Sequence, residues 1–84
     1  MTKMNEVVEL IVLENYRIQI KFNDGEIKVV NIKPFLGKGF TAELLDYDKF
    51  KNVYIEPGGG IAWLNGYDFC PNFLKELASE KITV

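Results

Sequence analysis

The stretch YRIQIKFNDGEIKVVNI, residues 16–32, decides the fold because two alternating segments flank an Asp-Gly pair. Residues 16, 18, 20 and 22 are apolar, and residues 17, 19 and 21 are polar. This period of two is typical of a strand with one buried face. Asp-Gly indicates a two-residue turn, since both central positions favour positive φ. We therefore predict an antiparallel hairpin in which Phe22 lies opposite Ile27 and Ile20 opposite Val29.

The preceding segment VVELIVL, residues 7–13, predicts another strand, whose register has two solutions. A two-residue turn at 14–15 would place Glu9 on the apolar face, whereas a three-residue loop aligns residues 8, 10 and 12 with that face. We favour the three-residue loop because a buried unpaired carboxylate is costly. Ile11 and Leu13 then lie on the opposite face near Val30 and Ile32. That face is too apolar to be freely solvated, so we expect something to cover it.

Later segments complete the expected architecture. Residues 35–40 indicate a loop, and residues 41–50 one or two helical turns with Thr41 as N-cap. Residues 52–56 and 61–64 predict two short strands joined at 57–60. Pro71 suits the first turn of a helix capped by Cys70, and residues 73, 74, 77 and 78 form its apolar stripe. We predict one α+β domain over 1–84. It has a three-stranded antiparallel meander, a second short hairpin, a short central helix and a C-terminal helix packed on the sheet.

Composition excludes several classes of function. No apolar run approaches the roughly 20 residues of a membrane-spanning helix, and the first six residues lack the plan of a signal peptide. The net charge is −2, without a basic block, which disfavours nucleic-acid binding. The chain has a single cysteine and no internal disulfide can form, so we expect a cytoplasmic protein.

No motif predicts catalysis, a cofactor or a metal. The glycine triplet 58–60 leads into a strand, whereas phosphate-binding loops lead into helices, so we interpret it as a mobile hairpin tip. Cys70 is a candidate nucleophile, but the chain has no histidine to serve as base or zinc ligand. The carboxylates of Asp46, Asp48 and Asp68 are interpreted as solvated or capping groups.

Apolar and aromatic side chains supply the candidates for partner binding. Trp63 is interpreted as a core or hairpin anchor, with a partner-binding surface as the alternative. Asn65-Gly66 is interpreted as a second positive-φ turn of the Asp-Gly type. The candidate partner-binding residues are Trp63, Tyr67, Ile11, Leu13, Val30 and Ile32.

The order and spacing of a few residues resemble a known family. The residues are Phe22, Asp24 and Gly25, followed by Trp63, Asn65, Gly66 and Asp68 before the helix that contains Leu74. Over nearly its whole length the chain resembles the small bacterial proteins of domain of unknown function 2442, although Asn31 stands where the pattern has Asp. The resemblance implies an α+β fold and no established catalytic residues. It also implies a gene neighbourhood like that of toxin–antitoxin pairs, and some members are joined to a DNA-binding helix-turn-helix.

Two functions remain open. The first is a non-catalytic protein-binding module, antitoxin-like, whose partner is a neighbouring small protein or a second copy in a homodimer. The alternative is a small-ligand sensor with a pocket built from the aromatic residues Tyr47, Tyr54, Trp63 and Tyr67. A closed apolar pocket would favour the sensor, whereas an exposed patch or an open strand edge would favour the module.

Overall fold

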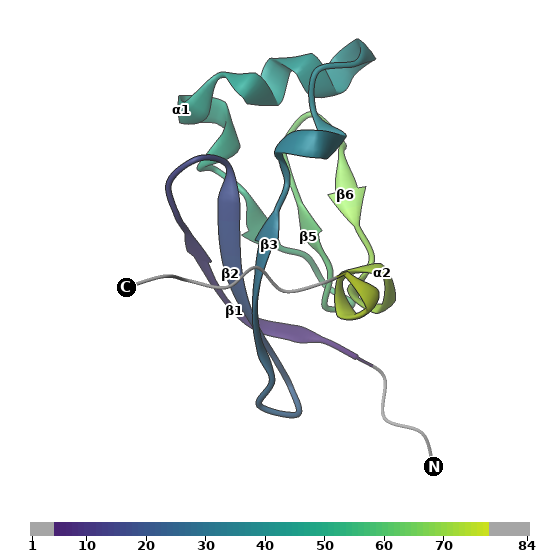
Figure 1. The fold of residues 1–84 in the computed structure, drawn as a ribbon. Coiled ribbons are helices and arrows are strands. Elements are labelled where there is room, and N and C mark those ends of the chain that lie inside the picture. The colour runs from purple at the N-terminus through teal and green to yellow at the C-terminus, as the bar shows by residue number, and fades with distance from the viewer. Residues whose placement is uncertain (1–4, 78–84) are drawn as a thin grey trace.

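Two small antiparallel sheets form the framework of the structure (Figure 1). The computed structural model describes residues 5–77, apart from the side chain of residue 40. The sheets have the strand orders β1-β2-β3 and β4-β5-β6. This confirms the predicted α+β fold, although β6 was not predicted. The elements are β1 (Val7–Val12), β2 (Arg17–Phe22), β3 (Ile27–Asn31), the 3-10 helices η1 (Lys33–Phe35) and η2 (Gly39–Leu45), α1 (Tyr47–Phe50), β4 (Tyr54–Ile55), β5 (Ile61–Ala62), β6 (Asp68–Phe69) and α2 (Pro71–Glu76).

The predicted three-residue loop between β1 and β2 is confirmed. The backbone N–H of Leu13 donates to the carbonyl of Arg17 at 2.8 Å, which leaves residues 14–16 as the connection. Residues 10 and 12 pair with residues 20 and 18 and share their face. Glu9 pairs with Lys21 on the opposite face, where their side chains form an ion pair at 3.4 Å. The carboxylate therefore stays in solvent, as predicted.

A bulge at the start of β1 changes which valine enters the core. The register shifts between Val7 and Glu9, so that Val7 rather than Val8 lies opposite Phe22. Val7 is buried and Val8 is exposed. The extra residue of a bulge is not signalled by the alternation of the sequence, so the prediction that Val8 aligns with the buried face is wrong.

The prediction that Phe22 lies opposite Ile27 is wrong by one residue, because the loop holds three residues and not two. The N–H of Phe22 donates to the carbonyl of Glu26 at 2.8 Å, and that of Gly25 donates to Phe22 at 2.9 Å. Within this loop only Gly25 has positive φ, at 93°. Asp24 Oδ1 accepts from the N–H of Glu26 at 3.0 Å. This is the three-residue hairpin loop in which glycine takes the left-handed position.

The corrected register moves alternate residues of β3 to the other face. Ile20 pairs with Lys28, and Val29 pairs with residue 19, so the predicted pairing of Ile20 with Val29 is also wrong. Residues directly opposite each other share a face of the sheet. Lys28, Val30 and Ile32 therefore point toward the core, and all three are buried. The prediction that Val30 and Ile32 lie on the second face is wrong for this reason.

Lys28 connects the first sheet to helix α2. Its side chain is only 8% exposed. Its Nζ donates to the carbonyls of Leu77 at 2.7 Å and Leu74 at 3.5 Å, and also to that of Lys75. Carbonyls at a helix C-terminus lack partners within the helix and carry the negative end of its dipole. The buried ammonium satisfies these groups, and they in turn satisfy the ammonium.

Lys75 makes the reciprocal contact, from α2 back to the hairpin loop. Its Nζ lies 2.7 Å from Asp24 Oδ2, 2.7 Å from Glu26 Oε1 and 4.3 Å from the centre of the Phe22 ring. The hydrogen bond from Lys75 lowers the pKa of Asp24, and the hydrogen bonds to Asp24 and Glu26 raise the pKa of Lys75. Two lysines thus join α2 to the β2–β3 hairpin.

The N-terminus of α2 confirms the predicted cap. Cys70 is the N-cap, its Sγ accepts from the N–H of Phe73 at 3.4 Å, and proline occupies the first helical position. Leu74 is buried and Leu77 is half-buried against the core, whereas Phe73 is 38% exposed and stacks on Phe69 with ring centres 5.7 Å apart. The predicted contact of Ala78 lies outside the described residues.

The central helical region is longer and capped differently than predicted. Thr41 is not the N-cap, because η2 already begins at residue 39. Its buried hydroxyl instead donates to the carbonyl of Lys38 at 2.6 Å and accepts from the N–H of the same residue. Helix α1 has its own cap, Asp46, whose Oδ1 accepts from the N–H of Asp48 at 3.0 Å.

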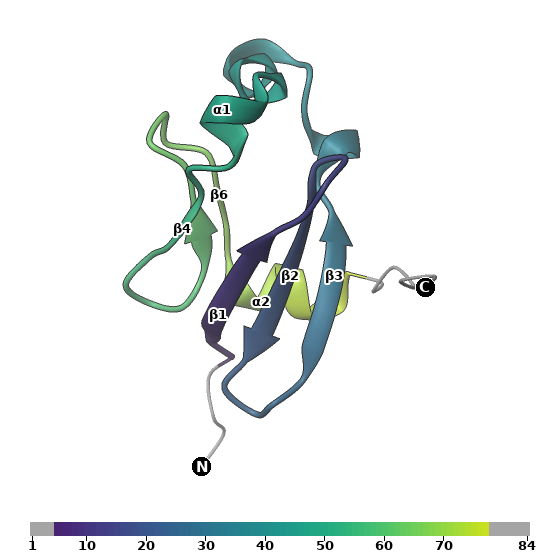
Figure 2. The same cartoon turned by 90° about the vertical axis from the view of Figure 1, so that its left-hand side faces the viewer.

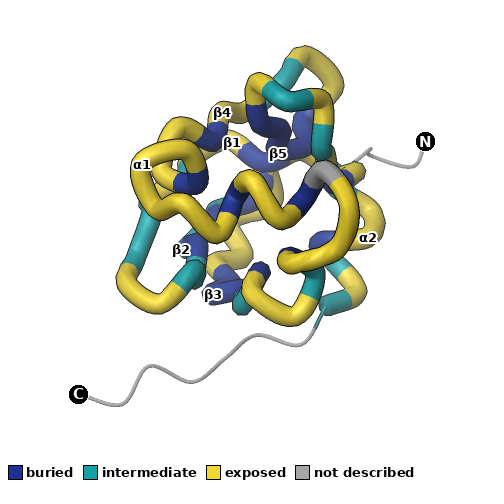
Figure 3. Tube along the Cα trace, turned by 90° about the horizontal axis from the view of Figure 1, so that it is seen from above, coloured by how far each residue is buried: buried dark blue, intermediate teal, exposed yellow. Residues whose placement is uncertain are grey.

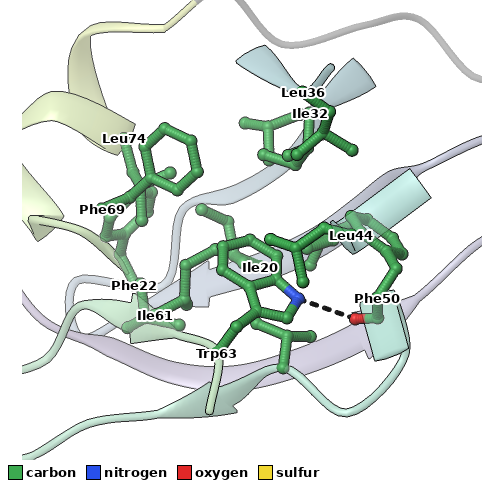
Figure 4. Packing of buried hydrophobic residues seen from close by; sticks show 14 residues of the cluster. Ile20, Phe22, Ile32, Leu36, Leu44, Phe50, Ile61, Trp63, Phe69 and Leu74 are labelled. Atoms are coloured by element: carbon green, nitrogen blue, oxygen red, sulfur yellow. Dashed lines mark hydrogen bonds between the residues drawn. The ribbon is translucent and has the colours of Figure 1, made fainter. Parts of the chain in front are cut away.

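The core fills the space between the two sheets, with α1 and η2 at one end (Figure 2). Trp63 lies in its centre, and its Nε1 donates to the carbonyl of Phe50 at 2.8 Å (Figure 4). Tyr67 stacks on the indole with ring centres 5.8 Å apart. The buried cluster consists of Val7, Ile18, Ile20, Phe22, Val30, Ile32, Leu36, Leu44, Phe50, Val53, Ile61, Trp63, Phe69 and Leu74.

The glycine triplet joins three parts of the backbone and is not a free hairpin tip. Gly59 and Gly60 are buried, and the Gly59 carbonyl accepts from the N–H of Val7 at 2.7 Å. A Cβ at position 59 would lie 2.6 Å from the Cα of Glu6, and one at position 60 would lie 2.4 Å from the carbonyl of Phe69. The expectation of a mobile tip is therefore wrong, because the strand ends need close backbone approach here.

We expect Lys28→Met to lower the free energy of unfolding by about 1–3 kcal/mol, because it keeps the apolar stem but leaves the carbonyls of α2 unsatisfied. Urea denaturation measures the change. Lys21→Met is the matched control, since its surface ion pair contributes at most about 1 kcal/mol. Equal losses in the two variants would contradict the role of Lys28.

We also expect Gly59→Ala to be more destabilising than Gly58→Ala. Both residues have positive φ, 91° and 107°, but a Cβ on Gly58 would meet nothing within 4 Å. Gly58→Ala should cost about 1–2 kcal/mol from backbone strain alone. Gly59→Ala should lose a further 1–3 kcal/mol or so from the clash with residue 6. Thermal melts of both variants test this, and similar midpoints would show that the junction yields freely.

Candidate functional site

The two loops that contain Asx-Gly pairs have the same backbone hydrogen-bond pattern. In the second loop the N–H of Trp63 donates to the carbonyl of Tyr67 at 2.9 Å, and that of Gly66 donates to Trp63 at 3.0 Å. Asn65 Oδ1 accepts from the N–H of Tyr67 at 3.1 Å, and only Gly66 of this loop has positive φ, at 96°. The prediction that both Asn65 and Gly66 have positive φ is therefore wrong, as it was for Asp24 and Gly25 in the first loop. These residues set strand register.

Three of the four side chains that could support catalysis have structural contacts: Asp46, Asp48 and Cys70. Asp46 caps α1, and Asp48 forms an ion pair with Lys51 at 3.3 Å. Asp68 is exposed on β6, and Cys70 caps α2. Within residues 5–77, no three Cys, Asp or Glu side chains form a group that could hold a metal ion. No helix in the same range is long and apolar enough to cross a membrane.

The structure does not bring the six predicted partner-binding residues together on one surface. Tyr67 is half-buried, its hydroxyl donates to the carbonyl of Phe35 at 3.4 Å, and burial raises the pKa of Tyr67. Leu13 is half-buried, and Ile11 is 51% exposed. The other three residues are buried in the core: Trp63, Val30 and Ile32.

The outer face of the first sheet is not a continuous apolar surface. Ile11 on β1 and Ile27 on β3, which is 56% exposed, lie on opposite edge strands. Between them β2 presents the polar row Arg17, Gln19 and Lys21. The one-residue change of register removed residues 30 and 32 from this face. The predicted apolar second face therefore does not exist in the form expected.

Exposed apolar side chains instead occur on two neighbouring strands of different sheets. β1 and β4 lie side by side (Figure 3), and each is an edge strand of its own sheet. Four apolar residues on these strands are exposed, and we call them the β1–β4 surface: Val8, Ile11, Tyr54 and Ile55. Sequence reasoning missed Val8 because of the bulge, and it missed the surface because nothing in the sequence pairs β1 with β4.

A pocket of about 180 Å³ lies between the central helical region and the loop after β5. Leu64, in that loop, is 85% exposed beside it. Glu43 and Lys49 form an ion pair at 3.8 Å in the pocket wall. Of the four aromatic residues predicted to form a ligand pocket, only Trp63 lines this one. We call it the Leu64 pocket; its lining residues are Glu43, Leu44, Lys49, Asn52, Trp63, Leu64 and Asn65.

Comparison with known proteins identifies the family. No curated protein and no solved structure matches the chain. A family model described as "Protein of unknown function (DUF2442)" matches residues 7–80, which includes every strand and both α-helices of the described residues. The match also spans both Asx-Gly loops and the glycine junction, whose geometry fixes the register of the strands. The chain belongs to the DUF2442 family.

Proposed function

We propose that the protein is a small non-catalytic module that binds another protein through the β1–β4 surface. The observation that carries the proposal is the exposure of Val8, Ile11, Tyr54 and Ile55 on adjacent edge strands. Burying apolar side chains is the main favourable term in protein association. Edge strands also offer unpaired backbone groups to an added strand. This surface therefore combines two features that a protein partner can use.

The use of the polar side chains supports a non-catalytic role. Asp24 and Asn65 close the two hairpin loops, and Asp46 and Cys70 cap helices. Each of these contacts stabilises a local backbone conformation. A catalytic group needs in addition a neighbour that activates it and a site for the reacting atom, whereas Asp24, Asp46 and Asp48 are occupied in a turn, a cap and a surface ion pair.

The Leu64 pocket argues for the module over the small-ligand sensor. Its volume of about 180 Å³ is below the roughly 300–1,000 Å³ typical of small-molecule sites. Tyr47 and Tyr54 do not line it, and Tyr67 stacks on Trp63 without lining the pocket. An enclosed aromatic pocket, the feature that favours a sensor, is not formed by these residues.

The proposed partner is a protein in the cytoplasm. We propose an antitoxin-like arrangement with a neighbouring small protein, and a homodimer where that protein is absent. The same apolar residues serve both associations, because an exposed surface that is buried by one partner is open to a second copy when the partner is missing.

Sedimentation velocity over a concentration series tests the proposal. We expect wild-type protein to associate reversibly, and Ile11→Glu to weaken association by about tenfold or more, since burying such a side chain contributes about 1.5–3 kcal/mol. Ile27→Glu is the matched control, because Ile27 has similar exposure on the opposite edge strand. Circular dichroism checks that both variants fold.

Two results would contradict the proposal. One is equal weakening by Ile11→Glu and Ile27→Glu, which would place the interface elsewhere. The other is a combination of two observations. Wild-type protein is monomeric at every concentration, and it retains from the native cell no protein whose binding is lost with Ile11→Glu.

A further inference from the structure

The Leu64 pocket has a fixed apolar floor. Leu44 and Trp63 form this floor, and both are buried in the core. The indole of Trp63 is held by its hydrogen bond to the carbonyl of Phe50 (Figure 4) and by stacking on Tyr67. The floor therefore needs no rearrangement to receive a ligand, which lowers the entropic cost of binding.

The fold does not require a leucine at position 64. Leu64 is the most exposed large apolar side chain among the described residues, at 85%. It occupies the first position of a three-residue loop, and the same position in the equivalent loop after β2 is Asn23. The shared loop geometry is thus compatible with a polar residue. An exposed leucine beside a pocket is a feature of a binding site, where it can close over a bound group.

The wall of the pocket matches a peptide group. Glu43 and Lys49 are about half exposed and lie 3.8 Å apart. A carboxylate accepts hydrogen bonds and an ammonium donates them, so the pair complements the N–H and C=O groups that flank a side chain in an extended polypeptide. The pocket is open and too small to enclose a typical metabolite. The remaining surface of a larger partner would cover its rim.

We propose that the Leu64 pocket is an anchor site for one large apolar side chain, such as leucine, methionine or phenylalanine, presented by an extended segment of the partner protein. The side chain packs under Leu64, which supplies most of the exposed apolar surface, and above the small exposed parts of Leu44 and Trp63. The adjoining peptide groups bond to Glu43 and Lys49. The inference rests on the proposed function, since it assumes a protein partner, but it concerns a site separate from the β1–β4 surface.

A capped amino acid tests the site without any partner. N-acetyl-leucinamide carries one leucine side chain and two peptide groups, and Trp63, the chain's one tryptophan, reports on occupancy by fluorescence. We expect saturable binding with a Kd on the order of 10 mM, and chemical-shift changes confined to the amides of residues 43–52 and 63–66. N-acetyl-alaninamide should bind about tenfold more weakly, because it buries less apolar area.

Variants locate the site. Leu64→Ser should weaken binding of N-acetyl-leucinamide by about tenfold. Ile27→Ser is the matched control, since it makes the same kind of change at another exposed apolar residue, and it should leave binding unchanged. Ile11→Glu should also leave it unchanged, so that unweakened association of this variant, with binding of the amide retained, would overturn only the proposed β1–β4 interface. Absence of saturable binding, or equal binding by the leucine and alanine amides, would overturn the anchor site. Tighter binding of free leucine than of its capped amide would overturn it too, in favour of an amino-acid site.

Discussion

The interaction on which the rest of the structure depends is the one between the buried ammonium of Lys28 and the carbonyls at the C-terminus of α2. It is possible only in one register of the β2–β3 hairpin, since a shift by one residue would turn Lys28 outward and Val29 inward. The same shift would expel Val30 and Ile32 from the core. A three-residue loop thus sets both the composition of the core and the position of the helix.

Local patterns in the sequence were enough for most of the elements. Alternation identified β1, β2 and β3, and the proline after Cys70 identified the start of α2 and its cap. The cost of burying Glu9 identified the correct loop before β2. Each of these predictions depends on residues close together in the chain, and each concerns a strong energetic preference. The α+β class follows from the elements themselves.

Most of the errors have a different cause, because they concern contacts between distant segments. An Asp-Gly pair fits a two-residue or a three-residue loop, and the choice is made by the contact of Lys28 with α2 and by the contact of Lys75, on α2, with the hairpin loop. The close approach of residue 59 to residue 6 decides that the glycine triplet is packed. Of the six residues predicted to bind a partner, only Ile11 is largely exposed. Residues of a strand that do not face the core face the surface, so an error of one residue in register exchanges the two sets, as it did for Val30 and Ile32. The β1–β4 surface and the Leu64 pocket both require knowledge of which strands and loops become neighbours.

Nuclear Overhauser effects between Hα protons across the hairpin test the register most directly. Strands pair most closely at their non-hydrogen-bonded positions, where Cα atoms lie about 4.5 Å apart. The structure predicts strong Hα–Hα effects between Gln19 and Val29 and between Lys21 and Ile27. Strong effects between Ile20 and Val29 and between Phe22 and Ile27 would instead establish the two-residue turn. They would remove Lys28 from α2 and contradict the account of the core.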